Sequence, residues 1–288
     1  MLLSFDCYIY LANPIPMKRF LLFILFLPFA IVHLHAADNY PVGARSAALA
    51  NASVTFSDLW SSFHNQAGLA DLKDVTAGVY FENKFLISDL SLKGLAVAIP
   101  TTKSGTFALS VTLFGGSLYS EKKAGIGYAK KLSETFSAGV QLDYLSTYIA
   151  EDYGTRNSFA VEAGFIAEPI KNLKLGAHIF NPNKAKVAEY ADERMPVILR
   201  FGASYKFSEK VIISVEEEKD IELQSVFKAG LEYHVMEAFY LRGGIASNPS
   251  LSSFGFGLNM KQFVVDFSTS WHQQLGFTPQ FALSYVFK

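Results

Sequence analysis

The stretch TFALSVTLF, residues 106–114, places a large apolar side chain at every second position from Phe107 to Leu113. The residues between them are Ala, Ser or Thr. Successive side chains of a β-strand point to opposite faces, so a period of two predicts a strand with one apolar and one polar face. The stretch FSAGVQLDYL, residues 136–145, repeats this pattern. From about residue 75 to the C-terminus the same period dominates, which predicts an all-β fold.

The alternating segments predict fourteen strands. Most are close to the roughly 9–11 residues that a tilted strand needs to cross a bilayer. The connections after even-numbered strands are mostly short, and those after odd-numbered strands are generally longer, as in outer-membrane barrels with periplasmic turns and extracellular loops. The predicted strands lie near residues 75–83, 92–99, 106–114, 123–131, 136–148, 157–167, 173–181, 196–207, 211–218, 224–235, 239–246, 251–260, 263–271 and 280–287.

Three of the short turns predict the register of their hairpins, because cross-strand partners must point to the same face. All three turns keep large apolar residues together on one face, and two of them bring opposite charges together on the other. The resulting partners include Met260 with Phe263, Gly257 with Asp266, Tyr205 with Ile213, Arg200 with Glu218, Tyr233 with Leu241, and Glu232 with Arg242.

A soluble β-sandwich also alternates, with its large side chains in a shared core. The polar face argues against it, because glycines are poor choices for a freely solvated sheet surface but suit a crowded barrel lumen. These glycines are Gly139, Gly164, Gly176, Gly202, Gly230, Gly244 and Gly255. We therefore predict a 14-stranded antiparallel transmembrane β-barrel over residues 75–288, with its large side chains in lipid.

The residues before the barrel divide into three segments. Residues 17–36 have the form of a signal peptide, with Lys18 and Arg19 before an apolar run too short for a comfortable membrane span; an uncleaved anchor is the alternative. Residues 1–16 are predicted to be translated upstream sequence, because Met17 begins the signal better than Met1 does. Residues 38–74 lack the period of two and are predicted to form an N-terminal hatch, or plug, in the barrel.

Composition and motifs argue against several functions. The formal net charge is −1 and the pI about 6.6, so no nucleic-acid partner is expected. The one cysteine, Cys7, precedes the predicted cleavage site, and no His-Glu-x-x-His or Gly-x-Ser-x-Gly motif occurs. We expect no catalytic residues, metal or cofactor. A barrel enzyme that assembles Ser and His from distant strands remains an alternative.

The predicted hatch carries a family resemblance. Gly43-Ala44-Arg45-Ser46-Ala47, then Ala50-Asn51-Ala52-Ser53-Val54, and finally Asn65-Gln66-Ala67-Gly68-Leu69-Ala70 resemble the N-terminal segment of the PorV/PorQ family, which is related to the FadL long-chain fatty-acid transporters. The resemblance implies a fourteen-stranded barrel with an N-terminal hatch, surrounded by lipid in the outer membrane of a Gram-negative bacterium. Gln66 replaces the proline that the family often has at this position.

Two groups of residues are candidates for function. The first group is expected to pack the hatch or hydrogen-bond it to the wall, or else to cap local turns: Gly43, Arg45, Asn65, Gln66 and Gly68. The second is expected to form a network of paired charges in the lumen, with a ligand or ion path as the alternative: Arg200, Glu218, Lys228, Glu232, Arg242 and Asp266.

The family resemblance implies a role in type IX protein secretion at the cell surface. The expected partners are then secretion-system proteins or exported cargo. The alternative is passive, FadL-like transport of hydrophobic small molecules across the outer membrane, with such a molecule as the partner.

Overall fold

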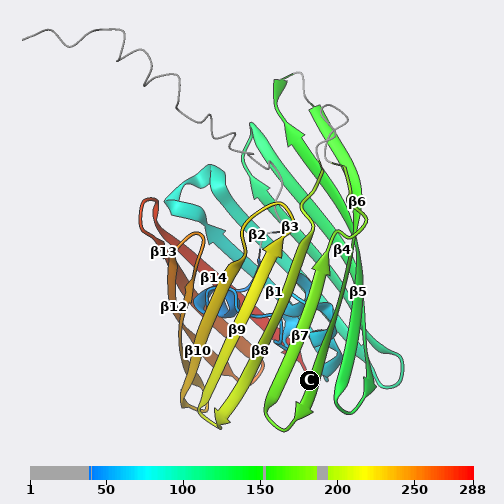
Figure 1. Ribbon diagram of the computed structural model, residues 1–288, viewed down its shortest axis with the longest axis vertical. Helices are drawn as coiled ribbons and strands as arrows, with labels where there is room; N and C mark the ends of the chain where they lie inside the picture. Colours follow the sequence, from blue (N-terminus) through cyan, green and yellow to red (C-terminus); the bar gives the residue numbers. More distant parts are fainter. Residues whose placement is uncertain (1–38, 40, 152–153, 187–193) are drawn as a thin grey trace, which may run out of the picture. The chain divides into compact units, whose positions relative to one another are not determined.

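A computed structural model describes residues 39, 41–151, 154–186 and 194–288. The predicted upstream stretch 1–16 and signal peptide 17–36 lie outside the described residues. Within the described residues, fourteen antiparallel strands form a closed barrel (Figure 1). The strands are β1 (Val75–Asn83), β2 (Ser91–Thr101), β3 (Gly105–Gly115), β4 (Tyr119–Ser133), β5 (Phe136–Ile149), β6 (Gly154–Ile170), β7 (Leu173–Phe180), β8 (Ile198–Ser208), β9 (Val211–Asp220), β10 (Val226–Met236), β11 (Phe239–Ala246), β12 (Leu251–Met260), β13 (Phe263–His272) and β14 (Gly276–Phe287).

The last strand closes the barrel. β14 pairs with β13 on one side and with β1 on the other, where Phe281 lies opposite Phe81 and Tyr285 opposite Ala77. Every other strand pairs with its neighbours in sequence. Closure leaves no unpaired strand edge, which is a requirement for a sheet that crosses a bilayer.

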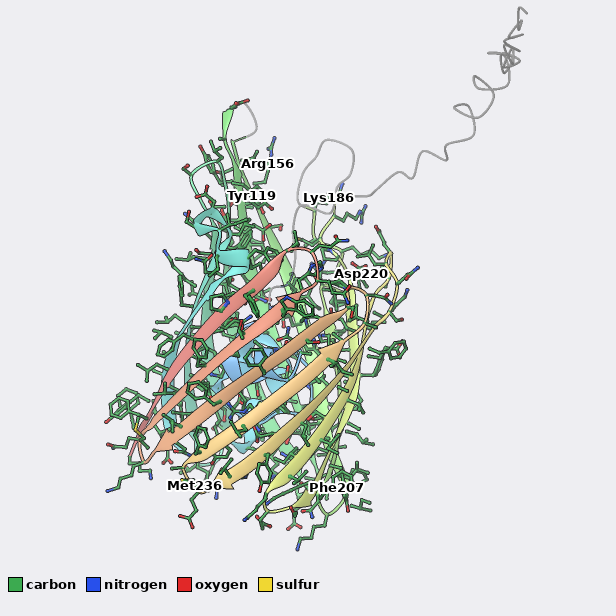
Figure 2. The ribbon with its side chains drawn as sticks, turned by 90° about the vertical axis from the view of Figure 1, so that its left-hand side faces the viewer. Tyr119, Arg156, Lys186, Phe207, Asp220 and Met236 are labelled. Atoms are coloured by element: carbon green, nitrogen blue, oxygen red, sulfur yellow. The ribbon has the colours of Figure 1, made fainter. Side chains whose placement is uncertain are left out.

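The hairpin registers agree with the sequence prediction. The structure pairs Met260 with Phe263, Arg200 with Glu218 and Glu232 with Arg242. The short turns gather at one end of the barrel and the longer connections at the other, as Figure 2 shows with Phe207 and Met236 at the short-turn end and Tyr119, Arg156, Lys186 and Asp220 at the long-loop end.

The outer face of the barrel is an apolar surface. Large side chains that point outward are about half exposed, including Leu109 at 53% and Phe227 at 60%. Soluble monomers rarely expose a contiguous apolar surface of this extent, and a β-sandwich would bury these residues, so the sandwich alternative is wrong. Hydrocarbon is the solvent that such a face requires. Separately, none of the helices in the described residues is long and apolar enough to cross a membrane.

The N-terminal segment, residues 41–74, lies inside the barrel, where Figure 1 shows it in blue behind the strands. It contains the helix α2 (Ala44–Ala48) and the 3-10 helices η1 (Leu59–Phe63) and η2 (Gln66–Asp71). Its apolar residues form the main core of the molecule with the inner face of the wall, where Trp60 and Phe63 pack with Leu92 of β2. Two further 3-10 helices, η3 (Lys84–Leu86) and η4 (Ser88–Leu90), lie in the β1–β2 connection.

We expect Leu142→Arg to impair assembly, because Leu142 lies near the middle of β5, is 51% exposed and faces lipid. A charge near the bilayer midplane costs about 2–4 kcal/mol, against about 0–1 near the interface. Leu132 of β4 also faces outward but lies beside a short turn, so Leu132→Arg is the matched control. Urea titration of refolded protein in lipid vesicles measures the difference, and equal losses in both variants would contradict this placement in the bilayer.

Candidate functional site in the barrel lumen

The N-terminal segment fits the lumen because glycines line the wall where its backbone passes. A Cβ on Gly244 would lie 2.3 Å from the carbonyl carbon of Leu49, and one on Gly139 would lie 2.5 Å from that of Gln66. Real Cβ atoms do not approach other atoms so closely. All seven glycines of the predicted polar face approach this segment in the same way, against Ala48, Leu49, Val54, Asn65 or Gln66.

Arg45 ties α2 to the wall. Its Nε and Nη2 donate to the two carboxylate oxygens of Glu232 at 2.8 and 3.0 Å, and its Nη1 donates to Asp58 Oδ2 at 3.0 Å. Burial by itself would lower the pKa of Arg45, but Glu232 and Asp58 raise it above its usual value, so the guanidinium stays charged. A bidentate pair of this kind fixes orientation as well as distance.

The carboxylate of Glu232 also contacts other residues of the barrel wall. Arg242 donates from Nε to Glu232 Oε2 at 2.7 Å and from Nη1 to Asp266 Oδ1 at 2.6 Å. His234 lies 3.0 Å from Glu232 Oε1 through its Nε2. Three of the lumen residues singled out in the sequence thus lie together with Arg45 at the short-turn end. We call this group the Arg45 cluster: Arg45, Asp58, Glu232, Arg242 and Asp266.

The other three predicted lumen charges lie nearer the long-loop end. Lys228 donates to Glu218 at 2.8 Å and to Glu216 at 3.2 Å, and Arg200 donates to Glu218 at 2.7 Å. Glu216 also accepts the backbone N–H groups of residues 53 and 54, both at 2.8 Å. Sequence reasoning missed Glu216, although it shares the inward parity of Glu218 on β9.

Gln66 contacts a third cluster of polar side chains, which was not predicted from the sequence. Its Nε2 donates to Glu162 Oε2 at 2.6 Å, and Lys123 donates to Glu162 Oε1 at 2.7 Å. His178 Nε2 lies 3.0 Å from the same Glu162 Oε2. Glu162 is fully buried and Lys123 largely so, which means that the N-terminal segment completes a charged group inside the wall. Glu162 on β6 and Lys123 on β4 both lie at inward-facing positions of the alternating pattern, and this was the sequence signal that could have identified them.

Asn65 bonds both to its own segment and to the barrel wall. Its Oδ1 accepts the N–H of Ala67 and caps η2, while its Nδ2 donates to the carbonyl of Val54 at 2.8 Å and to that of Phe165 on β6 at 3.1 Å. Gly68 lies where the backbone of the segment passes close to Phe56, since a Cβ at Gly68 would be 2.0 Å from the Phe56 carbonyl oxygen.

Two further residues stabilise the turns of the segment. Gly43 has a φ of 122°, which L side chains rarely adopt, and precedes α2 beside the ring of Trp60. His64 Nε2–H donates to the Val42 carbonyl at 2.6 Å. Burial, together with nearby Arg200, lowers the pKa of His64 to about 3, so this imidazole is neutral at physiological pH.

On the outside, a hollow of about 460 Å³ lies over β5 to β8, lined by Phe136, Phe165 and Phe201 among others. Gly139 and Gly164, which also line it, are the residues against which Gln66 and Asn65 pack from within. At this place only the backbone of the wall separates the N-terminal segment from the hydrocarbon side.

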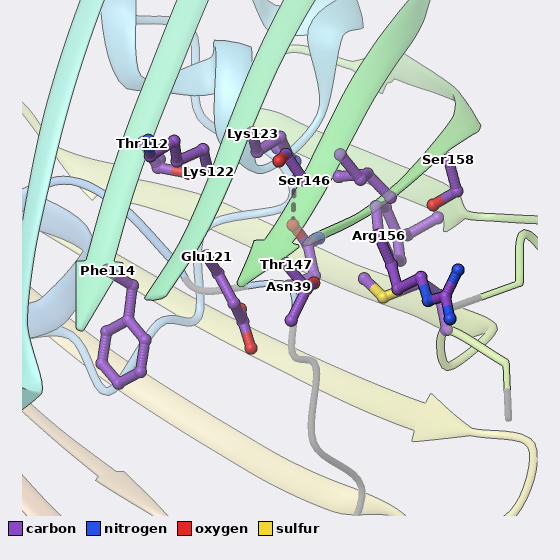
Figure 3. A pocket seen from close by; sticks show the side chains of 13 residues that line it. Asn39, Thr112, Phe114, Glu121, Lys122, Lys123, Ser146, Thr147, Arg156 and Ser158 are labelled. Atoms are coloured by element: carbon purple, nitrogen blue, oxygen red, sulfur yellow. Dashed lines mark hydrogen bonds between the residues drawn. The ribbon is translucent and has the colours of Figure 1, made fainter. Parts of the chain in front are cut away.

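Cavities lie at both ends of the N-terminal segment. At the long-loop end a cavity of about 30 Å³ is lined by Thr112, Arg156 and others, and Lys123 there donates to Asn39 Oδ1 at 2.9 Å (Figure 3). At the short-turn end a cavity of about 340 Å³ borders the Arg45 cluster. Among the residues that the structure describes, no group of three or more His, Cys, Asp or Glu could hold a metal ion.

Solved structures with the same architecture are outer-membrane channels, whereas no family model and no curated protein matches the chain. A deletion mutant of the monoaromatic hydrocarbon channel TodX aligns with a TM-score of 0.71 at 11% identity, covering 87% of this chain and 99% of that one. A FadL homologue from Pseudomonas aeruginosa aligns with a TM-score of 0.66 at 13% identity, covering 86% and 99%.

The monoaromatic hydrocarbon channel CymD aligns with a TM-score of 0.62 at 14% identity, covering 85% of this chain and 97% of that one. The fold of this chain is therefore that of the FadL-family outer-membrane barrels. At these identities the likeness concerns the fold, and the particular function must be argued from the lumen.

Proposed function

We propose that this protein is a passive channel for hydrophobic small molecules in the outer membrane of a Gram-negative bacterium, with residues 38–74 as its hatch. The observation that carries the proposal is a lumen occupied by a segment that hydrogen bonds and ion pairs hold to the wall, with a cavity at either end. Polar contacts of this kind can be exchanged for water, so a hatch attached in this way can shift without unfolding the barrel.

The similar structures TodX and CymD support this choice, since both are described as monoaromatic hydrocarbon channels. The proposal predicts that cells expressing the protein take up an uncharged aromatic hydrocarbon such as toluene faster than a deletion strain. Uptake of radiolabelled toluene at low external concentration measures the rate, and a hydrophilic sugar of similar mass serves as the control solute. Equal toluene uptake in both strains would refute the channel.

A second candidate function is association with type IX secretion, which the PorV/PorQ-like sequence of residues 43–70 favours. In that role residues 38–74 would still close the barrel, and the partners would be secretion-system proteins or exported cargo. Mild detergent extraction followed by affinity purification tests this candidate. Recovery of the barrel alone, together with unchanged protein export in the deletion strain, would eliminate it.

A further inference from the structure

The short-turn cavity lies on the side of the N-terminal segment that faces the predicted periplasm. Leu59, Trp60 and Leu72 of the segment line it, and inward-facing residues of β1 and β9 to β14 complete it. Its volume of about 340 Å³ falls at the lower end of the range for small-molecule pockets, about 300–1,000 Å³. Arg45 and His234 at its edge are 23% and 24% exposed, so solvent reaches it.

Most of the surface area that lines the cavity is apolar. Trp60 and Tyr240 contribute aromatic rings, while Ile212, Val264 and Val286 contribute branched aliphatic side chains from the barrel wall. Aromatic faces of this kind favour stacked or edge-to-face contact with another ring. The Arg, Asp and Glu residues of the lining all belong to the Arg45 cluster, and Thr76, His234, Asn259 and Ser284 add further polar groups.

The charges of that cluster do not favour an anion. Arg45 is already bonded to Glu232 and Asp58, and Arg242 to Glu232 and Asp266. Two guanidinium groups and three carboxylates sum to a formal net charge of −1. A carboxylate entering the cavity would meet net negative charge and two cations that already have partners. An uncharged ring meets no such penalty.

We propose that this cavity is a binding site for an uncharged aromatic molecule, and that it discriminates against the carboxylate of the same ring. The proposal rests on the proposed function, since a channel would deliver such a molecule to this end of the lumen. It adds to that function a specific holding site on the periplasmic side of the N-terminal segment, built by Trp60, Tyr240 and the branched residues of the wall.

The chain contains two tryptophans, and Trp60 lines the cavity while Trp271 on β13 faces outward. In a Trp271→Phe background, Trp60 is the only tryptophan that can report on binding. Nitrobenzene, an uncharged quencher, is titrated into the purified protein in detergent, and 4-nitrobenzoate is titrated in parallel. We expect saturable quenching by nitrobenzene and only linear, collisional quenching by 4-nitrobenzoate.

Variants on one strand separate the cavity from the detergent. Val264 points into the cavity and Val265 to the outer face of β13, so Val264→Phe should weaken nitrobenzene binding at least tenfold and Val265→Phe should leave it unchanged. Ile212→Phe, from the opposite wall, repeats the test should Val264→Phe fail to fold. Saturable binding of 4-nitrobenzoate with equal or higher affinity, or nitrobenzene binding unchanged in the filled variants, would overturn the proposal.

The binding test and the uptake test can fail separately. Saturable binding without toluene uptake would support the site and refute the channel. Uptake without saturable binding would refute the site and leave the channel standing.

Discussion

Replacing Gly244 by valine is expected to drive the N-terminal segment from the lumen while the barrel stays closed. A Cβ at this position would lie 2.3 Å from the carbonyl carbon of Leu49 and 2.5 Å from the nitrogen of Ala50. Both are backbone atoms, which cannot turn aside as a flexible side chain does. Gly230, the cross-strand partner of Gly244, also packs on Leu49, so the clash cannot be relieved toward β10. Overpacking costs about 1–3 kcal/mol and occasionally more.

Trypsin cleavage measures the release of the segment, because Arg45 and Lys73 are the only Arg or Lys residues between 41 and 74. The native protein should resist cleavage after Arg45, and Gly244→Val should be cut there within minutes, as mass spectrometry of the products shows. Gly243→Val is the control: it lies next to Gly244 on β11 but a Cβ there would have only Ser253 O, at 3.9 Å, nearby. Equal cleavage of the two variants would contradict the proposed packing of the segment on the glycines.

The fold could be predicted because alternation and turn length both report on one physical arrangement, a sheet with lipid on one side. The prediction was least complete where that arrangement ends. β4 begins at Tyr119 and β6 at Gly154, both before the predicted 123–131 and 157–167. At the long-loop end water can solvate both faces of a strand, so polar residues such as Glu121 and Arg156 no longer alternate with apolar ones.

Contacts between hairpin partners, such as Arg200 with Glu218, follow from register and could be predicted for that reason. The contacts between the N-terminal segment and the wall could not be predicted in this way. Arg45 contacts Glu232 across 187 residues of sequence and Gln66 contacts Glu162 across 96, and neither contact is set by a local turn. Inward parity identifies the wall residues that are available, but only the docked position of the segment selects which of them bind it.

Removing the guanidinium of Arg45 is expected to release the same segment by a different route. In Arg45→Met, Asp58 loses its ion pair to Arg45, and Glu232 retains only Arg242 and His234. Breaking a buried pair costs about 3–5 kcal/mol, and the partial exposure of Arg45 and Asp58 reduces this to on the order of 2–4 kcal/mol. Because the barrel wall is unaffected, we expect brief openings to small ions in planar bilayers, where the unmodified protein stays closed.

Two further variants test whether the geometry of the guanidinium or its charge alone holds the segment. Arg45→Lys keeps the charge, but one ammonium cannot reproduce the three hydrogen bonds that Arg45 donates to Glu232 and Asp58, so its opening frequency should fall between those of the unmodified protein and Arg45→Met. In the double variant Arg45→Met/Glu232→Gln both sides of the Arg45–Glu232 ion pair are removed, and the two effects should combine less than additively. Strict additivity, or a closed Arg45→Met channel, would show that Arg45 does not hold the segment through Glu232.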